Sequence, residues 1–201
     1  MTFMKTKFAL ALLAPISVVA AAHGQGTLRI TFDGPPIVPP GGIYNTQQYY
    51  EAGMVFLPTP AAGSFQRVGV PTDPAQPNDG TAYVRAVFGQ GLLFSFLDGS
   101  VFTAISVDLA GLTTTTSGSA YCVGHHPDGS TVTADLFEYG GFRTLSFGAG
   151  FTNLKWVDIT SSMWSLDNLV ISVPEPGPAG LVLLGGLALG ASRRAGGRRQ
   201  S

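Results

Sequence analysis

The middle of this chain, residues 25–173, is a succession of short strand-like segments separated by turn residues, and this pattern limits what the chain can fold into. Threonine, valine and phenylalanine recur in the segments, and glycine, aspartate and proline lie between them. Such residues suit a pleated, half-buried strand better than a helix. Strands with turn signals every 8–12 residues or so are typical of an antiparallel sandwich. The sequence therefore predicts an all-β domain, an antiparallel β-sandwich of jelly-roll type.

Ten segments are expected to form strands, and ten is taken as an upper count. They are 27–32, 53–57, 81–88, 91–96, 101–109, 119–123, 130–139, 142–147, 154–160 and 165–173. Two Asp-Gly turns, at 97–100 and 126–130, each lie between two of these segments and are predicted to close hairpins. The proline-rich segments 35–42 and 71–80 are predicted to be loops, because proline cannot donate to a strand ladder.

Residues 1–24 have the composition of a secretory signal peptide. Lys5 and Lys7 precede an apolar run that is too short for the roughly 20 residues of a spanning helix. Small residues follow this run, and they fit cleavage by signal peptidase after Ala22 or after Gly24. The sequence leaves both cleavage points open and predicts export by the Sec machinery.

The charge of the protein changes once its two ends are set aside. The whole chain has a net charge of −1, but residues 25–173 contain five basic and eleven acidic residues. An acidic domain is a poor match for nucleic acid, which attracts basic surfaces, so nucleic acid is not an expected partner. The single cysteine, Cys122, can form no disulfide within the chain and is expected to be a small buried side chain.

The C-terminal segment, residues 174–201, combines three features in a fixed order. Pro174, Glu175 and Pro176 form a stiff spacer that can neither continue a strand nor open a helix. Residues 179–192 are all apolar, glycine or serine, and as a helix they would span about 21 Å, short of the roughly 30 Å hydrocarbon core. A cluster of arginines follows, and it would hold the C-terminus on the cytoplasmic side. Its members are Arg193, Arg194, Arg198 and Arg199. This composition predicts a temporary membrane stop.

These C-terminal features resemble the PEP-CTERM sorting signal of Gram-negative bacteria: a Pro-Glu-Pro motif, a short transmembrane helix and an arginine-rich tail. The resemblance implies passage across the inner membrane, transient anchoring there, and processing by an exosortase, a membrane peptidase. It also implies delivery to the cell surface or the extracellular space, often alongside exopolysaccharide production. The predicted organisation is thus a signal peptide (1–24), a sandwich domain (25–173) and a sorting signal (174–201).

The sandwich segment is similar, more loosely, to the domain often found ahead of this signal. The stretches "ITFDGPP" and "YYEAGMVFLP" resemble its opening strands, and "WSLDNLVIS" resembles its closing strand. Many such domains look like the jelly rolls of carbohydrate-binding modules. The resemblance implies a fold and leaves the ligand open, because one fold hosts many functions.

No residue pattern indicates a catalytic site. His125 and His126 are neighbours in a predicted hairpin turn, and adjacent residues on a strand point to opposite faces, so we expect no metal between them. Nothing singles out a catalytic pair among the eleven acids of residues 25–173. The chain is therefore expected not to be an enzyme, and a secreted hydrolase is the least favoured of the functions considered.

Calcium is the one cofactor that the sequence suggests, because carboxylate oxygens suit it. Asp33 ends the first predicted strand and Asp167 lies in the last, positions that a sandwich can bring together. Asp73, Asn78 and Asp79 form a second oxygen-rich loop. The alternative is that Asp33 and Asp167 bond to turn amides and that Asp79 starts a turn.

Sugar binding requires exposed aromatic rings beside polar side chains. Tyr44, Tyr49 and Tyr50 lie in a polar segment expected to be a loop or an edge strand, and Trp164 follows two serines. The alternative packs these rings in the core, to which Trp156 is also assigned. The sequence predicts a structural or adhesive surface or matrix protein that acts with exopolysaccharide in a biofilm. The alternative function is a carbohydrate-binding module with a calcium-stabilised sandwich.

Overall fold

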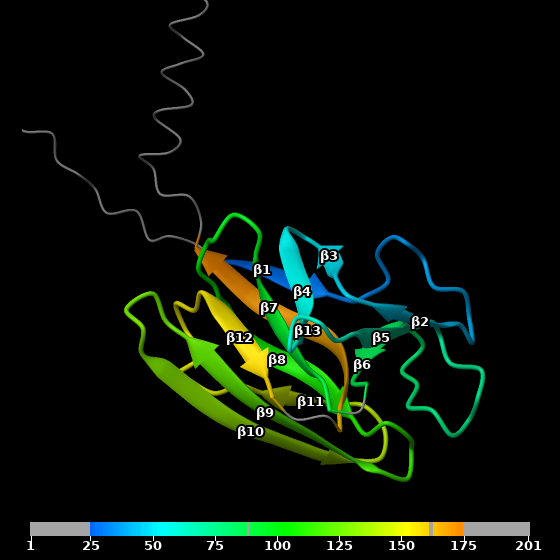
Figure 1. Ribbon diagram of the computed structural model, residues 1–201. Coiled ribbons are helices and arrows are strands. Elements are labelled where there is room, and N and C mark those ends of the chain that lie inside the picture. Colours follow the sequence, from blue (N-terminus) through cyan, green and yellow to red (C-terminus); the bar gives the residue numbers. More distant parts are fainter. Residues whose placement is uncertain (1–24, 88, 161–162, 175–201) are drawn as a thin grey trace, which may run out of the picture. The chain divides into compact units, whose positions relative to one another are not determined.

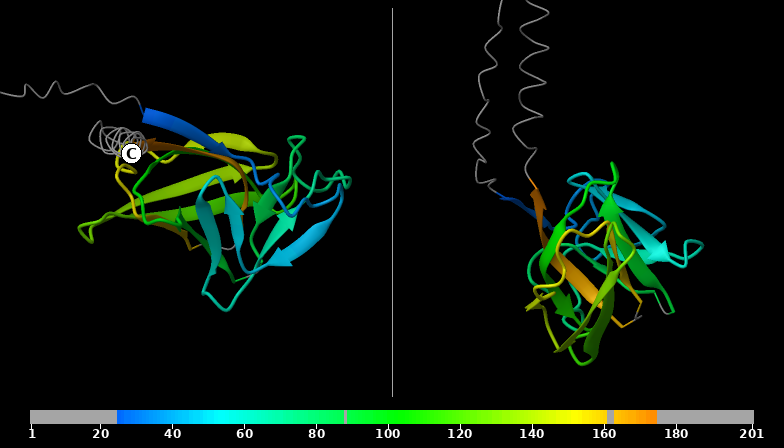
Figure 2. Two further views of the ribbon diagram at one scale, coloured as in Figure 1. Left: turned by 90° about the horizontal axis from the view of Figure 1, so that it is seen from above. Right: turned by 90° about the vertical axis from the view of Figure 1, so that its left-hand side faces the viewer.

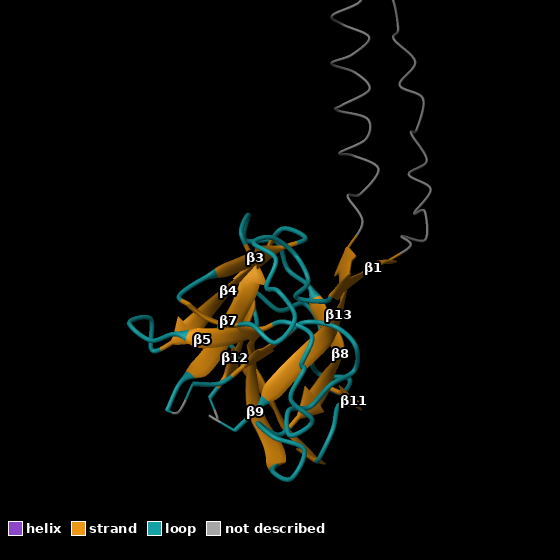
Figure 3. Cartoon of the chain, turned by 90° about the vertical axis from the view of Figure 1, so that its right-hand side faces the viewer, coloured by secondary structure: helices purple, strands orange, loops and turns teal. Residues whose placement is uncertain are grey.

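The computed structural model describes residues 25–87, 89–160 and 163–174. All helices and strands assigned within these residues are of one kind, β-strands, and none is a helix (Figure 3). No helix capable of crossing a membrane occurs in this part of the chain. The predicted signal peptide, C-terminal helix and arginine cluster lie outside the described residues, as do Glu175 and Pro176 of the sorting motif.

The described strands form two antiparallel sheets (Figure 1). One sheet has the order β11-β8-β13-β6-β5-β2, with β1 paired to β13, and the other has the order β10-β9-β12-β7-β4-β3. We call them the seven-stranded and the six-stranded sheet. The strands are β1 (Gln25–Ile30), β2 (Ile43–Thr46), β3 (Tyr49–Glu51), β4 (Met54–Thr59), β5 (Phe65–Val68), β6 (Tyr83–Arg85), β7 (Gly91–Phe96), β8 (Thr103–Ala110), β9 (Ser117–His125), β10 (Thr131–Tyr139), β11 (Arg143–Ser146), β12 (Trp156–Ile159) and β13 (Ser165–Pro174). The first and last of them, β1 and β13, run side by side (Figure 2). The prediction of an antiparallel β-sandwich is confirmed.

Two details of the predicted strands are wrong. The upper count of ten strands is too low, because β2, β3 and β5 have only three or four residues each, too few for an alternating pattern to stand out. The turn at 126–130 closes the β9–β10 hairpin as predicted. The turn at 97–100, however, joins β7 to β8, which belong to different sheets. An Asp-Gly turn sets the local reversal of the chain but not the sheet that the next strand joins.

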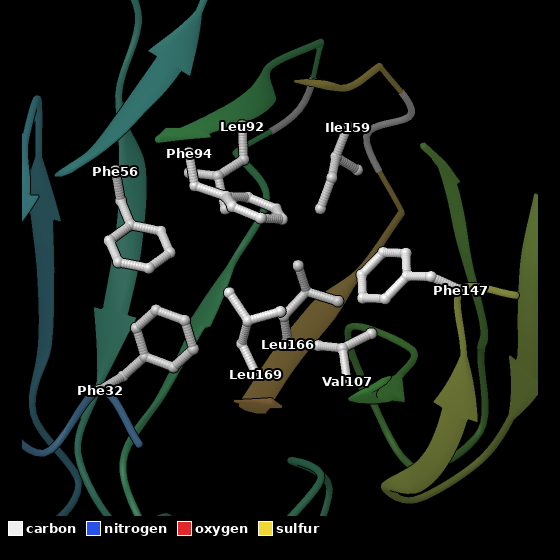
Figure 4. A pocket seen from close by; sticks show the side chains of 9 residues that line it. All are labelled: Phe32, Phe56, Leu92, Phe94, Val107, Phe147, Ile159, Leu166 and Leu169. Atoms are coloured by element: carbon white, nitrogen blue, oxygen red, sulfur yellow. The ribbon is translucent and has the colours of Figure 1, made fainter. Parts of the chain in front are cut away.

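Aromatic and aliphatic side chains from both sheets meet in one core (Figure 4). Phe56 and Phe94 of the six-stranded sheet point toward Leu166 and Leu169 of the seven-stranded sheet, and the space left among them is only about 10 Å³. Cys122 is fully buried in this core, as predicted, and burial raises the pKa of its thiol to about 12. The domain is therefore held together by packing, with an unreactive cysteine inside.

A buried arginine fixes the loop that follows β1. Arg67 is 3% exposed and lies 4.1 Å from the centre of the Tyr49 ring, and burial lowers the pKa of its guanidinium. The guanidinium donates hydrogen bonds of 2.6 to 2.8 Å to the carbonyl oxygens of Phe32, Gly34 and Pro36. Glu51 accepts hydrogen bonds of 2.8 Å from the Tyr49 hydroxyl and 2.9 Å from the Phe32 amide, so this network joins β3 to the loop. The network holds the loop that carries Asp33.

Candidate functional site

Asp33 and Asp167, the two candidate calcium ligands, bond to adjacent residues. Asp33 accepts a hydrogen bond of 2.9 Å from the Ala82 amide, and Asp167 accepts one of 2.6 Å from the Thr81 hydroxyl. Asp33, after the first strand, and Asp167, in the last strand, are thus both hydrogen-bonded to the segment 81–82. Both carboxyl groups are therefore engaged in hydrogen bonds within the protein.

The surroundings of Asp167 are those of a hydrogen-bonded network. Asp167 is fully buried, and burial together with the nearby Asp79 carboxylate raises its pKa to about 9. The Asn168 side-chain amide donates to Asp79 at 3.2 Å and to Asp108 at 2.8 Å, so an amide group lies where a cation would have to bind those carboxylates. Among the described residues, no group of three or more His, Cys, Asp or Glu side chains is placed to hold a metal ion. Calcium binding by Asp33 and Asp167 stays a prediction that this arrangement does not favour.

The second oxygen-rich loop predicted from sequence forms local turns. Asp73 accepts the Ala75 amide at 2.9 Å, and Asn78 accepts the Gly80 amide at 2.8 Å. Asp79 accepts a hydrogen bond of 3.2 Å from the Thr81 amide. These bonds between residues two apart are those of Asx turns, and they explain the aspartates and the asparagine without a ligand.

The four candidate glycan-contact residues separate into two groups. Tyr49 and Trp164 are buried in the core, in agreement with the alternative interpretation that packs these rings between the sheets. Tyr44 and Tyr50 are exposed, but Tyr44 lies on β2 and Tyr50 on β3, strands of different sheets. Only Tyr50 therefore belongs to the surface described next.

The outer face of the six-stranded sheet carries a set of aromatic side chains, which we call the aromatic face. In β9 and β10, alternation turns Cys122 and Leu136 inward and the neighbouring residues outward. Phe137 and Tyr139 on β10 are 63% and 67% exposed. The aromatic residues of this face are Tyr50, Tyr121, Phe137, Tyr139 and Trp156. An exposed apolar surface is a candidate interaction site where its residues are neighbours, as the diagonal pair Tyr121 and Phe137 are across β9 and β10.

Trp156, which the sequence assigns to the core, lies on this outer face. Val157 and Ile159 of β12 point into the core, so Trp156 and Asp158 point outward. The indole Nε1 of Trp156 donates to Asp158 at 3.2 Å, and the ring of His125 stacks on the indole with centroids 4.5 Å apart. The Nε2 of His125 also lies 3.1 Å from the Asp158 carboxylate. Two neighbours thus hold the indole in one orientation.

The two adjacent histidines lie in different surroundings. His125 is the last residue of β9, where the sequence predicts a turn, and it belongs to the Trp156 stack. His126 lies in the turn itself, with its Nδ1 3.3 Å from the carbonyl oxygen of Asn153. The two rings therefore have different neighbours.

An open hollow of about 300 Å³ lies beside Trp156, a size at the lower end for small-molecule sites. It is lined by Leu93, Ser95, Phe96, Gly99, Lys155 and Trp156. In the sheet, β12 has β9 on one side and β7 on the other, so Trp156 has His125 and Ser95 as its cross-strand neighbours. Because His125 covers the indole on the β9 side, the ring face toward β7 is the one that borders the hollow. An aromatic surface, a hydroxyl and an ammonium group therefore meet there.

The hollow belongs to a row of side chains that crosses the whole sheet. From β10 to β3, the paired residues are Thr131, His125, Trp156, Ser95, Val55 and Tyr50. Neighbouring strands are about 4.8 Å apart, so Tyr50 and Trp156 are separated by roughly 14 Å along this row. The aromatic face thus offers several contact points to an elongated ligand that lies across the strands.

No protein-family model matches this sequence, and no curated protein matches it either. Among solved structures, the chain is similar to the family 11 carbohydrate-binding module of a cellulosomal cellulase from Clostridium thermocellum, with 12% identity and a TM-score of 0.33 over 77% of this chain and 96% of that one. The chain is also similar to a family 11 module from Clostridium thermocellum in complex with a β-1,3-1,4-mixed-linked tetrasaccharide. The identity is again 12% and the TM-score 0.33, over 77% of this chain and 98% of that module.

A third similar structure contains the CBM22-1 and GH10 modules of xylanase 10B from Clostridium thermocellum, complexed with xylohexaose. The identity is 16% and the TM-score 0.32 over 74% of this chain, which spans only 28% of that protein. Because all these identities and TM-scores are low, neither a ligand nor a site is transferred from these proteins to this chain.

Proposed function

We propose that this chain is an exported surface or matrix protein whose sandwich, of jelly-roll type, binds polysaccharide through the aromatic face. The observation that carries the proposal is Trp156, an indole stacked on His125, bonded to Asp158 and bordering an open hollow. The C–H groups of a sugar ring pack well on an aromatic surface, and its hydroxyls exchange hydrogen bonds with groups such as Ser95 and Lys155.

The rigidity of Trp156 supports the same proposal. A side chain that is already held in one orientation loses little conformational entropy when a ligand binds. His125 and Asp158 hold the indole before any ligand arrives, at 4.5 Å between ring centroids and 3.2 Å from the indole nitrogen to the carboxylate. A preorganised aromatic surface of this kind therefore lowers the entropy cost of binding a flexible polymer.

The test measures retardation of the full chain in gels that contain a soluble polysaccharide, including exopolysaccharide from the producing cells, β-glucan and xylan. We expect Trp156→Ala to raise the dissociation constant obtained from the retardation by roughly 30-fold or more, because loss of an aromatic hot spot costs about 2 kcal/mol of binding free energy. Tyr44→Ala is the matched control, because Tyr44 is 51% exposed but lies in the other sheet.

The outcomes separate clearly. Equal retardation of the native chain and Trp156→Ala would contradict the proposal, and so would loss of binding in Tyr44→Ala. The chain has two tryptophans, and Trp164 is fully buried, so a fluorescence change on adding ligand would report on Trp156. Release of reducing ends during long incubation would favour a hydrolase over a binding protein.

Delivery to the surface is a second part of the proposal, and it depends on residues 174–201. The order of Pro174, Glu175, Pro176, the apolar run and the arginines supports recognition by an exosortase after Sec export. Mass spectrometry of the exported protein is expected to show loss of the residues after this motif. A C-terminus intact at Ser201 would contradict processing, and unchanged processing after replacement of all four arginines would exclude them from the signal.

A further inference from the structure

The strand β10 is an open edge of the six-stranded sheet. Within the described residues it pairs with β9 alone, and it lies at the outer margin of the sheet (Figure 1). An edge strand presents unpaired backbone N–H and C=O groups, which form a template for another strand. Most folded proteins protect such an edge by making it short, by bending it with a bulge, by placing proline or charged side chains, above all lysine, on it, or by pointing a charged residue inward.

Most of these protections are absent from β10, although Glu138 near its end shares the inner face with Leu136. The strand has nine residues, and its register with β9 runs without a bulge from Thr131 to Tyr139. It contains no lysine and no proline, and its only charged residues are Asp135 and Glu138. The other edges of the two sheets are shorter: β1 has six residues, β2 and β11 have four, and β3 has three. Among the described strands, β10 is therefore the edge best suited to pairing.

The sequence of β10 is compatible with pairing to itself. In an antiparallel pair related by a two-fold axis, one residue faces its own copy and the rest pair symmetrically about it. A register centred on Asp135 or on Glu138 would set two identical carboxylates against each other, which is unfavourable. A register centred on Ala134 avoids this, because each Asp135 then faces Thr133 of the other copy, whose hydroxyl can donate to the carboxylate.

The remaining pairs of this register are also favourable. Val132 faces Leu136, so aliphatic side chains meet on the inner side, and Thr131 faces Phe137, a β-branched residue opposite an aromatic ring. A register centred on Leu136 would instead place each Asp135 opposite Phe137, with no hydrogen bond for the carboxylate. We propose that β10 pairs antiparallel with β10 of a second copy of this chain, centred on Ala134, and joins two six-stranded sheets into one.

The pairing has a consequence for the aromatic face. A two-fold axis perpendicular to the sheet keeps the outer faces of both copies on the same side, so two copies of Trp156 and its hollow would face one polysaccharide. Two linked sites bind more tightly than one, because the second contact is intramolecular. Only this consequence rests on the proposed function. The pairing itself is inferred from the length, the regular register and the residues of β10.

The test is sedimentation velocity of the full chain over a range of concentrations. Thr133→Asp would place like charges at two symmetric positions opposite Asp135, and we expect it to raise the dimer dissociation constant at least about tenfold. The double variant Thr133→Asp with Asp135→Thr exchanges the two residues, restores the hydroxyl–carboxylate pairs, and is expected to return the constant to near the native value. Thr27→Asp on β1 is the control, because it adds the same charge away from β10.

Three outcomes would each overturn the pairing: a native chain that stays monomeric at its highest soluble concentration, equal effects of Thr133→Asp and Thr27→Asp, or no recovery in the double variant. If far-ultraviolet circular dichroism shows that Thr133→Asp is unfolded, Thr133→Lys replaces it, because its ammonium group would pair with Asp135. A dimer that Thr133→Lys does not strengthen would then overturn the pairing. Dimerisation without polysaccharide retardation would contradict the proposed function and leave the β10 pairing supported. Retardation by a strict monomer would do the reverse.

Discussion

The six-stranded sheet is aromatic on both faces, and the two faces differ in what surrounds the rings. On the inner face, Phe56 and Phe94 are buried, and their centroids lie 5.9 Å apart among other apolar side chains. On the outer face, Trp156 has a histidine and a carboxylate as neighbours and borders an open hollow. The same residue type thus stabilises the fold on one face and is available to a ligand on the other.

The two tryptophans provide the largest test of this difference. Trp164 is fully buried, so Trp164→Ala removes a large core side chain and is expected to lower the free energy of unfolding by about 3–5 kcal/mol. Trp156→Ala removes a ring from the outer face and is expected to cost far less stability, about 1 kcal/mol or under. Urea denaturation of both variants measures the two values. Similar losses in the two variants would show that Trp156 is a core residue after all.

The assignment of these two residues shows where sequence reasoning reached its limit. Within 156–160, Trp156 shares its strand face with Asp158, whereas Val157 and Ile159 share the other, and this alternation identifies Trp156 as outward. Residue type alone favours the core for tryptophan, whereas the alternation of this strand predicts its position correctly. Trp164 offered no comparable pattern, because it stands just before β13, where no strand alternation defines its direction.

The fold was more predictable than the site, for a physical reason. Strand alternation and turn residues act locally, so ten of the strands and the β9–β10 hairpin could be predicted from segments of the sequence. The pairing of β12 with both β9 and β7 joins residues far apart in the chain, and this pairing creates the contact of His125 with Trp156. No local pattern contains it.

Asp167 tests the polar side of the interior. Its pKa of about 9 lies above the ordinary value near 3.9, so between these values the folded state holds a proton that the unfolded state has lost. The contribution of Asp167 to the free energy of unfolding is therefore fully present below about pH 4. It declines by about 1.4 kcal/mol per pH unit as the pH rises toward 9. Asp167→Asn is expected to remove this slope, which thermal unfolding of both chains from pH 5 to pH 8 would measure.

Calcium provides a control for the same group. A cation bound at Asp167 would replace the proton, so millimolar calcium would flatten the slope of the native chain and a chelator would restore it. The hydrogen bonds of Asp167 to Thr81 and Asn168 lead us to expect no effect of calcium. A parallel slope in the native chain and Asp167→Asn would show that another group carries the pH dependence.

Asp158 tests whether the outer face is preorganised. Asp158→Asn keeps the shape of the side chain but removes the charge opposite His125, and because this pair is partly exposed the cost in stability is expected to stay under about 1 kcal/mol. Polysaccharide retardation is expected to weaken by several-fold, because Trp156 loses part of its support. Asp158 acts here as a positioning residue, and recovery of retardation in Asp158→Glu, which keeps the charge but changes the length of the side chain, would separate its charge from its shape. Unchanged retardation in Asp158→Asn would show that the indole needs no carboxylate.

The smallest effect is expected at the far end of the aromatic face. Tyr139 is 67% exposed, so Tyr139→Ser removes little buried surface and is expected to change the free energy of unfolding by no more than about 0.5 kcal/mol. Chemical denaturation measures this change, and the same variant can be compared with the native chain in polysaccharide gels. If the aromatic face is a continuous binding surface, retardation falls although stability does not. A loss of stability as large as that of Trp164→Ala would instead mean that this ring is covered by another part of the protein, and the contrast between the two faces of the sheet would no longer hold.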